Sequence, residues 1–218
     1  MPSPLIIYPE STAVFSPAYY GTIDYYATLA KYGCAVIDYS SRFDKRLKST
    51  HRTTIADVNR ELSLTVPIEK PVSLTKATWG NIRLSSHGEW WHVHRVSIES
   101  AYGRTPFFEY YIDRFAEFLD KNVLSKHPTL QSLDTAINTV ICDILGIETD
   151  IRSHCDKEKY ADFRYNNFSQ LNPVEYYQVR QSEFGFIPHL SILDLIFNMG
   201  PEAPLILIKM KQECYKLL

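Results

Sequence analysis

The order of strand-like and helix-like segments most constrains the fold of this chain. Leu5-Ile6-Ile7-Tyr8 is a short apolar run next to a proline, which predicts a strand. Thr22 to Tyr32 places its apolar residues on one helical face, and Gly33 is the predicted stop signal. Cys34 to Asp38 predicts a second strand. Because a helix leads directly into a strand, we expect a mixed α/β layer arrangement.

The middle of the chain predicts a β-hairpin and then helices. Thr50 to Ala56 and Glu61 to Pro67 have strand character, and turn-forming residues lie between them. Ser86 to Glu89 fits a capping box, which would begin a helix that continues to about Tyr102. We also expect a strand at Asn81 to Leu84, a helix opened by Thr105-Pro106, and a helix from about Leu133 that stops at Gly146.

The last third of the chain is less regular. Glu148 to Asn172 is polar and lacks a steady period, which is typical of a long functional or mobile loop. Ser191 is a candidate helix N-cap, and Asp194 stands at the third helical position, so we assign both to the cap. Gly200-Pro201 closes that helix, and Pro204 to Leu218 predicts a helix or strand on the core.

Length and composition fit one folded unit. The chain has 218 residues, of which 45% are hydrophobic and 22% are charged, as in ordinary globular domains. We therefore predict an α+β or mixed α/β fold. It consists of a single domain over residues 1–218, with a small mixed sheet and several packed helices.

Charge and cysteine usage narrow the function classes. Lysine and arginine total 23 against 25 acidic residues, so the chain lacks the basic excess of a nucleic-acid-binding surface. The N-terminus lacks a basic leader, and no window is apolar enough to span a membrane. Cys34, Cys142, Cys155 and Cys214 lack the short spacing of zinc or redox motifs. These features predict a cytoplasmic protein with reduced thiols.

The densest chemical cluster is the histidine- and tryptophan-rich segment from His87 to His94. On a helix, His87 and His94 share one face while His92 points elsewhere, so three zinc ligands do not converge and we predict no metal site. Trp90 and His94 are neighbours one turn apart, which could place a general base beside an aromatic wall. The alternative is a buried histidine bonded to a carbonyl oxygen.

Two further segments are candidates for ligand contacts. Lys48 to Thr53 gathers two cations and several hydroxyls, which could hold a phosphate or carboxylate, with Arg52 as the anchor. The alternative there is a solvated basic turn. Asp38 ends a strand, where α/β proteins often place ligand-contacting groups, although a turn or helix cap is the structural alternative. Asp24 is interpreted as a surface residue of its helix.

Several separated blocks, which together cover nearly the whole chain, resemble the WbqC-like protein family. The most specific block comprises His87-Gly88-Glu89-Trp90, His94, Ser100-Ala101-Tyr102 and Pro106 to Tyr111. Phe186 to Asn198 resembles the family's C-terminal signature, Tyr20 to Leu29 resembles its opening segment, and Lys48 to Arg52 resembles its Lys-x-Thr/Ser-Tyr-Arg stretch.

The sequence also departs from the family pattern at several positions. Asp24, His51 and His189 stand where glutamine, tyrosine and asparagine are more usual. Thr53 and Thr54 replace an Asn-Arg pair, so an anion site in this segment has lost one expected cation and Arg52 alone is carried over.

The resemblance implies a role in bacterial surface polysaccharides, because the family is named from a protein of O-antigen synthesis. We expect a transferase of lipopolysaccharide biosynthesis that moves an acyl or aminoacyl group to a nucleotide-linked amino sugar without a cofactor. A sugar's amine must lose a proton in such a reaction, and His94 is the expected catalytic base. The competing hypothesis is a non-catalytic ligand-binding or assembly protein of the same pathway.

The expected site combines these segments in one polar pocket beside the helix of His94. Its expected aromatic walls come from Tyr102 or Phe107-Phe108. The substrate-binding residues that we predict are Arg52, Lys48, His87, Trp90, Tyr102 and Asp38.

Overall fold

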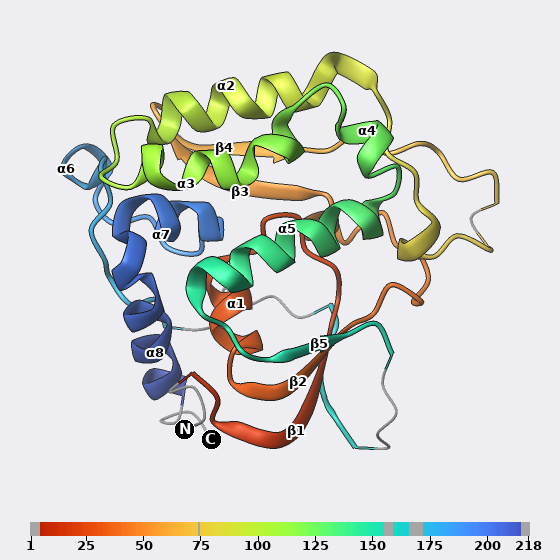
Figure 1. Ribbon diagram of the computed structural model, residues 1–218, viewed down its shortest axis with the longest axis horizontal. Helices are drawn as coiled ribbons and strands as arrows, with labels where there is room; N and C mark the ends of the chain where they lie inside the picture. Colours follow the sequence, from red (N-terminus) through yellow and green to blue (C-terminus); the bar gives the residue numbers. More distant parts are fainter. Residues whose placement is uncertain (1–4, 74, 155–158, 166–171, 215–218) are drawn as a thin grey trace.

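The computed structural model describes residues 5–73, 75–154, 159–165 and 172–214. Its main sheet has four parallel strands in the order β5-β2-β1-β6, formed by Asp150–Arg152, Tyr32–Ile37, Tyr8–Phe15 and Ala161–Phe163. A separate antiparallel hairpin pairs β3 (Arg52–Asp57) with β4 (Arg60–Thr65). Figure 1 shows this hairpin in the upper part of the view and the parallel sheet below it. The predicted α/β fold class is confirmed, with parallel and antiparallel pairing in two different sheets.

The first strand lies further along the chain than the sequence predicted. Leu5 to Ile7 is not a strand, and β1 begins at Tyr8. The last residues of β1, from Thr12 to Phe15, are all buried, as expected for a central parallel strand that is covered on both faces. Gly33 is a residue of β2 and not the helix stop that we predicted. A side chain at Gly33 would place Cβ 1.9 Å from the Pro9 carbonyl oxygen, so glycine permits the close approach of β1 and β2.

Helix α1 (Ile23–Leu29) connects β1 to β2, as the pattern predicted. The Thr22 side chain caps it by accepting a hydrogen bond from the Tyr25 amide at 3.2 Å.

The predicted β-hairpin is also confirmed, and its register pairs Arg52 with Thr65 and Asp57 with Arg60. Asn81 to Leu84 does not form the predicted strand, because this segment makes only isolated bridges and the 3₁₀ turn η2 (Trp79–Asn81).

Helix α2 (Trp90–Tyr102) begins later than predicted. The proposed capping box at Ser86 is wrong, because the Ser86 side chain makes no capping hydrogen bond. Gly88 has φ of 69° and Glu89 has φ of 44°, so the chain turns through the left-handed region before α2 begins. His87 to Glu89 instead forms the 3₁₀ turn η3.

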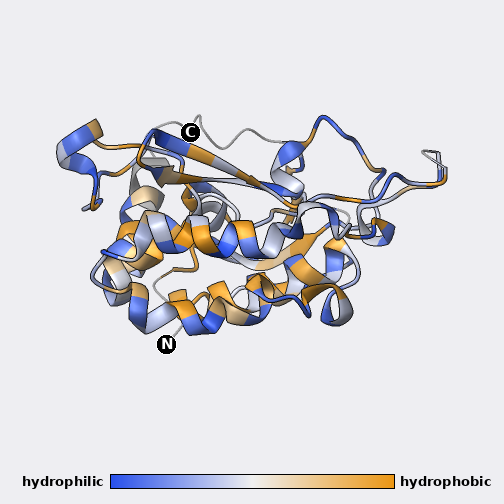
Figure 2. Ribbon diagram, turned by 90° about the horizontal axis from the view of Figure 1, so that it is seen from above, coloured by the Kyte–Doolittle hydropathy of each residue, from blue (hydrophilic) through white to orange (hydrophobic). Residues whose placement is uncertain are grey.

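The helices that follow α2 cover the core. Thr105-Pro106 precedes α3 (Phe108–Phe115) without opening it directly. The buried side of α3 is continued by two buried residues, Phe118 and Leu119, in η4 (Ala116–Leu119). The short helix α4 (Val123–Lys126) leads to α5 (Leu130–Leu145), which ends at Gly146 with φ of 60°, as predicted. Helices in Figure 2 carry both hydrophilic and hydrophobic residues along their length, as expected for amphipathic helices with one buried face.

The polar segment from Glu148 to Asn172 contributes two strands to the main sheet. Residues 155–158 and 166–171 of this segment lie outside the described residues. The described part contains β5 and β6, which pair with β2 and β1 respectively. The prediction of a long functional or mobile loop is therefore wrong for these two strands, since pairing with the central strands stabilises them despite their polar sequence.

The C-terminal part forms α6 (Gln181–Phe184), α7 (Ile192–Met199), the 3₁₀ turn η6 (Gly200–Glu202) and α8 (Ala203–Cys214). Ser191 caps α7, as predicted. Asp194 is not part of that cap, because its buried carboxylate accepts hydrogen bonds from the Tyr176 hydroxyl and from Gln178 Nε2. Burial raises the Asp194 pKa to about 6. Residues 215–218 of the predicted last element lie outside the described residues.

Candidate functional site

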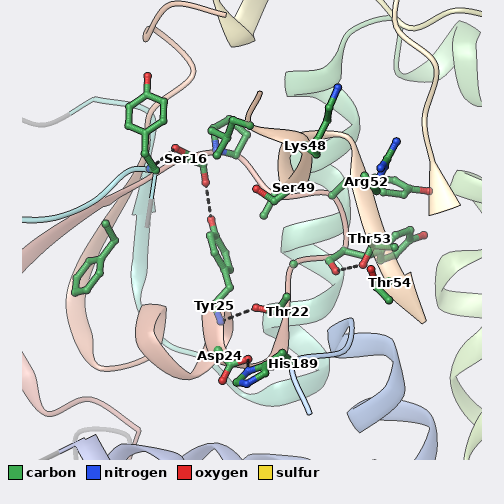
Figure 3. Close-up of a pocket in the computed structure, with 18 residues that line it drawn as sticks. Ser16, Thr22, Asp24, Tyr25, Lys48, Ser49, Arg52, Thr53, Thr54 and His189 are labelled. Carbon is green, nitrogen blue, oxygen red and sulfur yellow. Dashed lines mark hydrogen bonds and ion pairs between the residues drawn. The ribbon is translucent and has the colours of Figure 1, made fainter. Parts of the chain in front are cut away.

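A cavity of about 470 Å³ lies at the carboxyl ends of β1 and β6. The chain leaves β1 through α1 toward β2 on one side, whereas β6 pairs with the other side of β1. Open parallel sheets bind ligands in the crevice where the strand order reverses in this way. The polar residues that line the cavity include Ser16, Asp24, Lys48, Ser49, Arg52, Thr54 and His189. Figure 3 shows these side chains around the opening.

Strained backbone is concentrated around this cavity. Tyr20, Tyr165 and His189 line it, and their φ angles are 42°, 60° and 59°. The left-handed region costs a non-glycine residue energy, so it persists only where the surroundings hold it. The Tyr20 carbonyl accepts hydrogen bonds from Thr53 Oγ1 at 2.8 Å and from Ser191 Oγ at 3.0 Å. Such strain is common at functional sites, which supports this cavity as the candidate site.

Two cations line the cavity close to the start of the hairpin. Lys48 comes from the 3₁₀ turn η1 (Lys48–Thr50), and Arg52 is the first residue of β3. Arg52 Nε donates to Thr65 Oγ1 at 2.8 Å, which orients the guanidinium group. Within the described part of the chain, neither cation forms an ion pair with a carboxylate. Their charges are therefore available to an anionic ligand.

A histidine and an aspartate form a close pair in the same cavity. His189 Nδ1 lies 2.9 Å from Asp24 Oδ2, and the side chains are 25% and 1% exposed. The interpretation of Asp24 as a surface residue is therefore wrong, since its helix turns this face toward the segment before α7. Burial raises the Asp24 pKa above its ordinary value, while the bond to His189 acts in the opposite direction.

His94 lies outside the cavity and touches one of its walls. It is 2% exposed, and its Nδ1 lies 2.9 Å from the hydroxyl of Tyr19, which lines the cavity. The other side of the imidazole bonds to the Thr65 backbone. Burial raises the Tyr19 pKa well above its ordinary value, so this hydroxyl stays protonated and donates to His94. Burial lowers the His94 pKa to about 4, which keeps the imidazole neutral at physiological pH.

The structure places the remaining predicted site residues away from the cavity. Trp90 packs against His94 with ring centroids 5.2 Å apart, and its Nε1 donates to the Ser85 carbonyl. The Tyr102 hydroxyl is buried and accepts a hydrogen bond from the Ala56 amide. His87 is exposed in η3. Of the predicted residues, only Lys48 and Arg52 line the cavity.

Asp38 follows the last residue of β2, at the same edge of the sheet as the cavity but outside its lining. Its carboxylate accepts hydrogen bonds from the backbone and hydroxyl of Ser40 and from the Ser41 amide. Arg164 Nη1 contacts the other oxygen at 2.9 Å. Partial burial acts to raise the Asp38 pKa, but these hydrogen bonds lower it overall. Asp38 therefore stabilises a turn and ties the end of β2 to the segment after β6.

The sequence did not single out the aromatic walls or the histidine–aspartate pair of this cavity. Tyr25, Phe163 and Tyr165 line it, and Phe163 stacks on Phe15 at a centroid distance of 5.2 Å. The available signal for Asp24 and His189 was that both depart from the residues usual in the family. Among the described residues, no group of three histidine, cysteine or acidic side chains is arranged to hold a metal ion. No helix of the described chain is long and apolar enough to cross a membrane.

Comparison with known proteins gives one match. The model of the WbqC-like protein family matches residues 16–165 and 152–206. These residues include all of the cavity lining, from Ser16 to His189. No curated protein and no solved structure matches this chain.

Proposed function

Since this chain belongs to the WbqC-like protein family, we propose that it serves the synthesis of bacterial surface polysaccharides by binding a nucleotide-linked amino sugar. The proposed binding site is the cavity at the carboxyl ends of β1 and β6. Its volume of about 470 Å³ is in the range of small-molecule sites. In this proposal the protein works in the cytoplasm, where free cysteines such as Cys34 and Cys142 stay reduced.

The observation that carries the proposal is the position of Lys48 and Arg52 on one wall of the cavity. A guanidinium group matches phosphate oxygens with two parallel hydrogen bonds, and an ammonium group adds a point charge. Ser49 and Thr54 place hydroxyl groups beside the two cations. This combination suits the diphosphate of an activated sugar.

The aromatic walls suit the uncharged parts of the same ligand. Tyr165 lines the cavity and is 54% exposed, so its ring is accessible to a sugar or a nucleobase. Tyr25 and Phe163 lie deeper in the cavity wall. Phosphate contacts at one end and ring contacts along the walls would together orient the ligand.

The proposed reaction is the transfer of an acyl or aminoacyl group to the amine of the bound sugar. His94 was predicted as its base, and in the structure its imidazole reaches the cavity only through the Tyr19 hydroxyl. We therefore propose that His94 positions Tyr19 in the cavity wall. The burial of His94 favours the second candidate function, a protein of the same pathway that binds the sugar without acting on it.

Calorimetry with inorganic pyrophosphate and with UDP-glucosamine tests the site. Both probes are expected to bind the wild-type protein. Arg52→Lys should weaken both affinities about 10-fold although the charge is kept, because an ammonium group cannot reproduce the planar fork. Arg95→Lys is the matched control, since Arg95 is exposed on α2 and pairs with Glu99 outside the cavity. Equal affinities of wild-type and Arg52→Lys protein for both probes would refute the proposed anchor.

A further inference from the structure

The pair formed by His189 and Asp24 has the geometry of a base and the residue that orients it. Asp24 is in the first turn of α1, and His189 lies two residues before the N-cap of α7. His189 Nδ1 is 2.9 Å from Asp24 Oδ2, and both side chains line the cavity. In the view of Figure 3 this pair lies on the opposite side of the cavity from Lys48 and Arg52.

Backbone contacts hold the two residues together. The Ile23 amide donates to the Leu190 carbonyl at 3.1 Å, and the Ile192 amide donates to the Gly21 carbonyl at 2.9 Å. These bonds join the starts of α1 and α7, so the short segment that carries His189 is held against the helix that carries Asp24. The φ of 59° at His189 shows that this placement is maintained against a local conformational cost.

The pairing decides which imidazole nitrogen faces a ligand. A carboxylate that accepts from Nδ1–H fixes the neutral tautomer in which Nε2 carries a lone pair. Within the described residues, no hydrogen bond engages Nε2 of His189. The His189 side chain is 25% exposed, whereas the Asp24 side chain is 1% exposed, so the imidazole is the accessible member of the pair and the carboxylate is its buried partner. A poorly hydrated carboxylate stabilises the imidazolium that forms when Nε2 takes a proton.

We propose that His189, oriented by Asp24, is the general base of this site and accepts a proton from the amine of the bound amino sugar. This inference rests on the proposed function, in which the phosphate end of the same ligand lies against Lys48 and Arg52. In comparison with His94, which is 2% exposed, His189 has direct access to the cavity. The other titratable groups that line the cavity are Tyr19, Tyr20, Tyr25 and Tyr165.

In the proposed transfer step the acyl donor is a thioester, and every bond and proton is accounted for. The amine nitrogen attacks the thioester carbonyl carbon and forms the new C–N bond, while its proton passes to Nε2 of His189. The C–S bond then breaks, and its electron pair leaves with sulfur. The imidazolium returns the proton to the thiolate, so the products are an amide and a thiol and His189 is neutral again.

Long-range proton–nitrogen NMR on protein with ¹⁵N-labelled histidine tests the assignment without turnover. The free protein should show His189 with a protonated Nδ1 and an unprotonated Nε2, and Asp24→Asn should abolish this tautomer preference. UDP-glucosamine should shift the Nε2 signal, and inorganic pyrophosphate should leave it unchanged because it occupies only the cation end. A pair that merely ties α1 to α7 would show the same tautomer but no response of Nε2 to UDP-glucosamine, which would overturn the proposal.

Kinetics with UDP-glucosamine and acetyl coenzyme A provide the second test. His189→Gln should lower turnover about 100- to 10,000-fold while calorimetry gives an affinity for pyrophosphate equal to that of the wild type. His92→Gln is the control, because His92 is exposed on α2 and is not among the residues that line the cavity. Unchanged turnover in His189→Gln would reject the base and leave the binding site intact. If wild-type protein does not bind pyrophosphate, the proposed function itself is rejected.

Discussion

Replacing His94 with glutamine is expected to make the fold less sensitive to acid. The neutral imidazole accepts a hydrogen bond from the Tyr19 hydroxyl at Nδ1 and bonds to the Thr65 backbone on its other side. A glutamine amide also has one acceptor and a donor, but it does not take up a proton. Near pH 7.5 we expect the variant to be less stable by about 1–2 kcal/mol, because the ring that packs 5.2 Å from Trp90 is lost.

The pH dependence follows from the low His94 pKa. Burial lowers the His94 pKa from 6.5 to about 4 in the folded protein. Between pH 4 and pH 6.5, the unfolded chain therefore binds more protons at His94 than the folded protein does. The contribution of His94 to stability is therefore complete above pH 6.5 and is lost as the pH falls. By about pH 5 the loss is about 2 kcal/mol, since each pKa unit corresponds to about 1.4 kcal/mol. The His94→Gln variant does not lose this stability at low pH, because the glutamine side chain does not take up a proton.

Urea unfolding at about pH 7.5 and about pH 5 measures the difference. The stability deficit of His94→Gln should disappear or reverse at the lower pH. His51, whose pKa burial also lowers to about 4, contributes equally to both proteins and cancels in the comparison. His92→Gln serves as the control, because exposed His92 should leave the pH dependence unchanged. If wild-type and His94→Gln proteins lose the same stability between the two pH values, the reasoning is wrong.

Three further outcomes are expected. Gly33→Ala should lower the free energy of unfolding in urea by more than about 2 kcal/mol, because the new Cβ would clash with the Pro9 carbonyl. Gly88→Ala should lower it by about 1–2 kcal/mol, because the new Cβ meets open space and only the positive φ is unfavourable. Ser191→Ala should cost about 1–2 kcal/mol, since it removes both the cap of α7 and the bond to the Tyr20 carbonyl. Calorimetric heating should show one cooperative transition, and two separate transitions would contradict the predicted single domain.

Elements with local signals were predictable from the sequence. The hairpin of β3 and β4 has two strand-forming runs around turn residues, and both the runs and the turn are close in the chain. The cap of α1 by Thr22 and the end of α5 at Gly146 also depend on chemistry within one helical turn. The prediction failed where a residue type fits more than one local structure. Ser86 could have capped a helix but does not, and Gly33 could have ended a helix but lies within β2.

Strands β5 and β6 could not be predicted in this way. Each has three residues, and β5 is exposed along its whole length. Their backbone hydrogen bonds are made with β2 and β1, which are more than 100 positions earlier in the chain. A short polar segment becomes a strand only when a partner strand is already in place, and the sequence of the segment does not contain that partner.

The sequence by itself determined the fold class, the family and the closeness of the two cations Lys48 and Arg52, because these depend on neighbouring residues or on separate blocks that match the family. Tertiary structure alone decided that His94 is buried behind Tyr19 while His189 meets Asp24 in the cavity. His189 and Asp24 are separated by 165 positions. They meet because α1 and α7 begin side by side, and a contact of this kind is set by the packing of whole helices and not by the residues next to either partner.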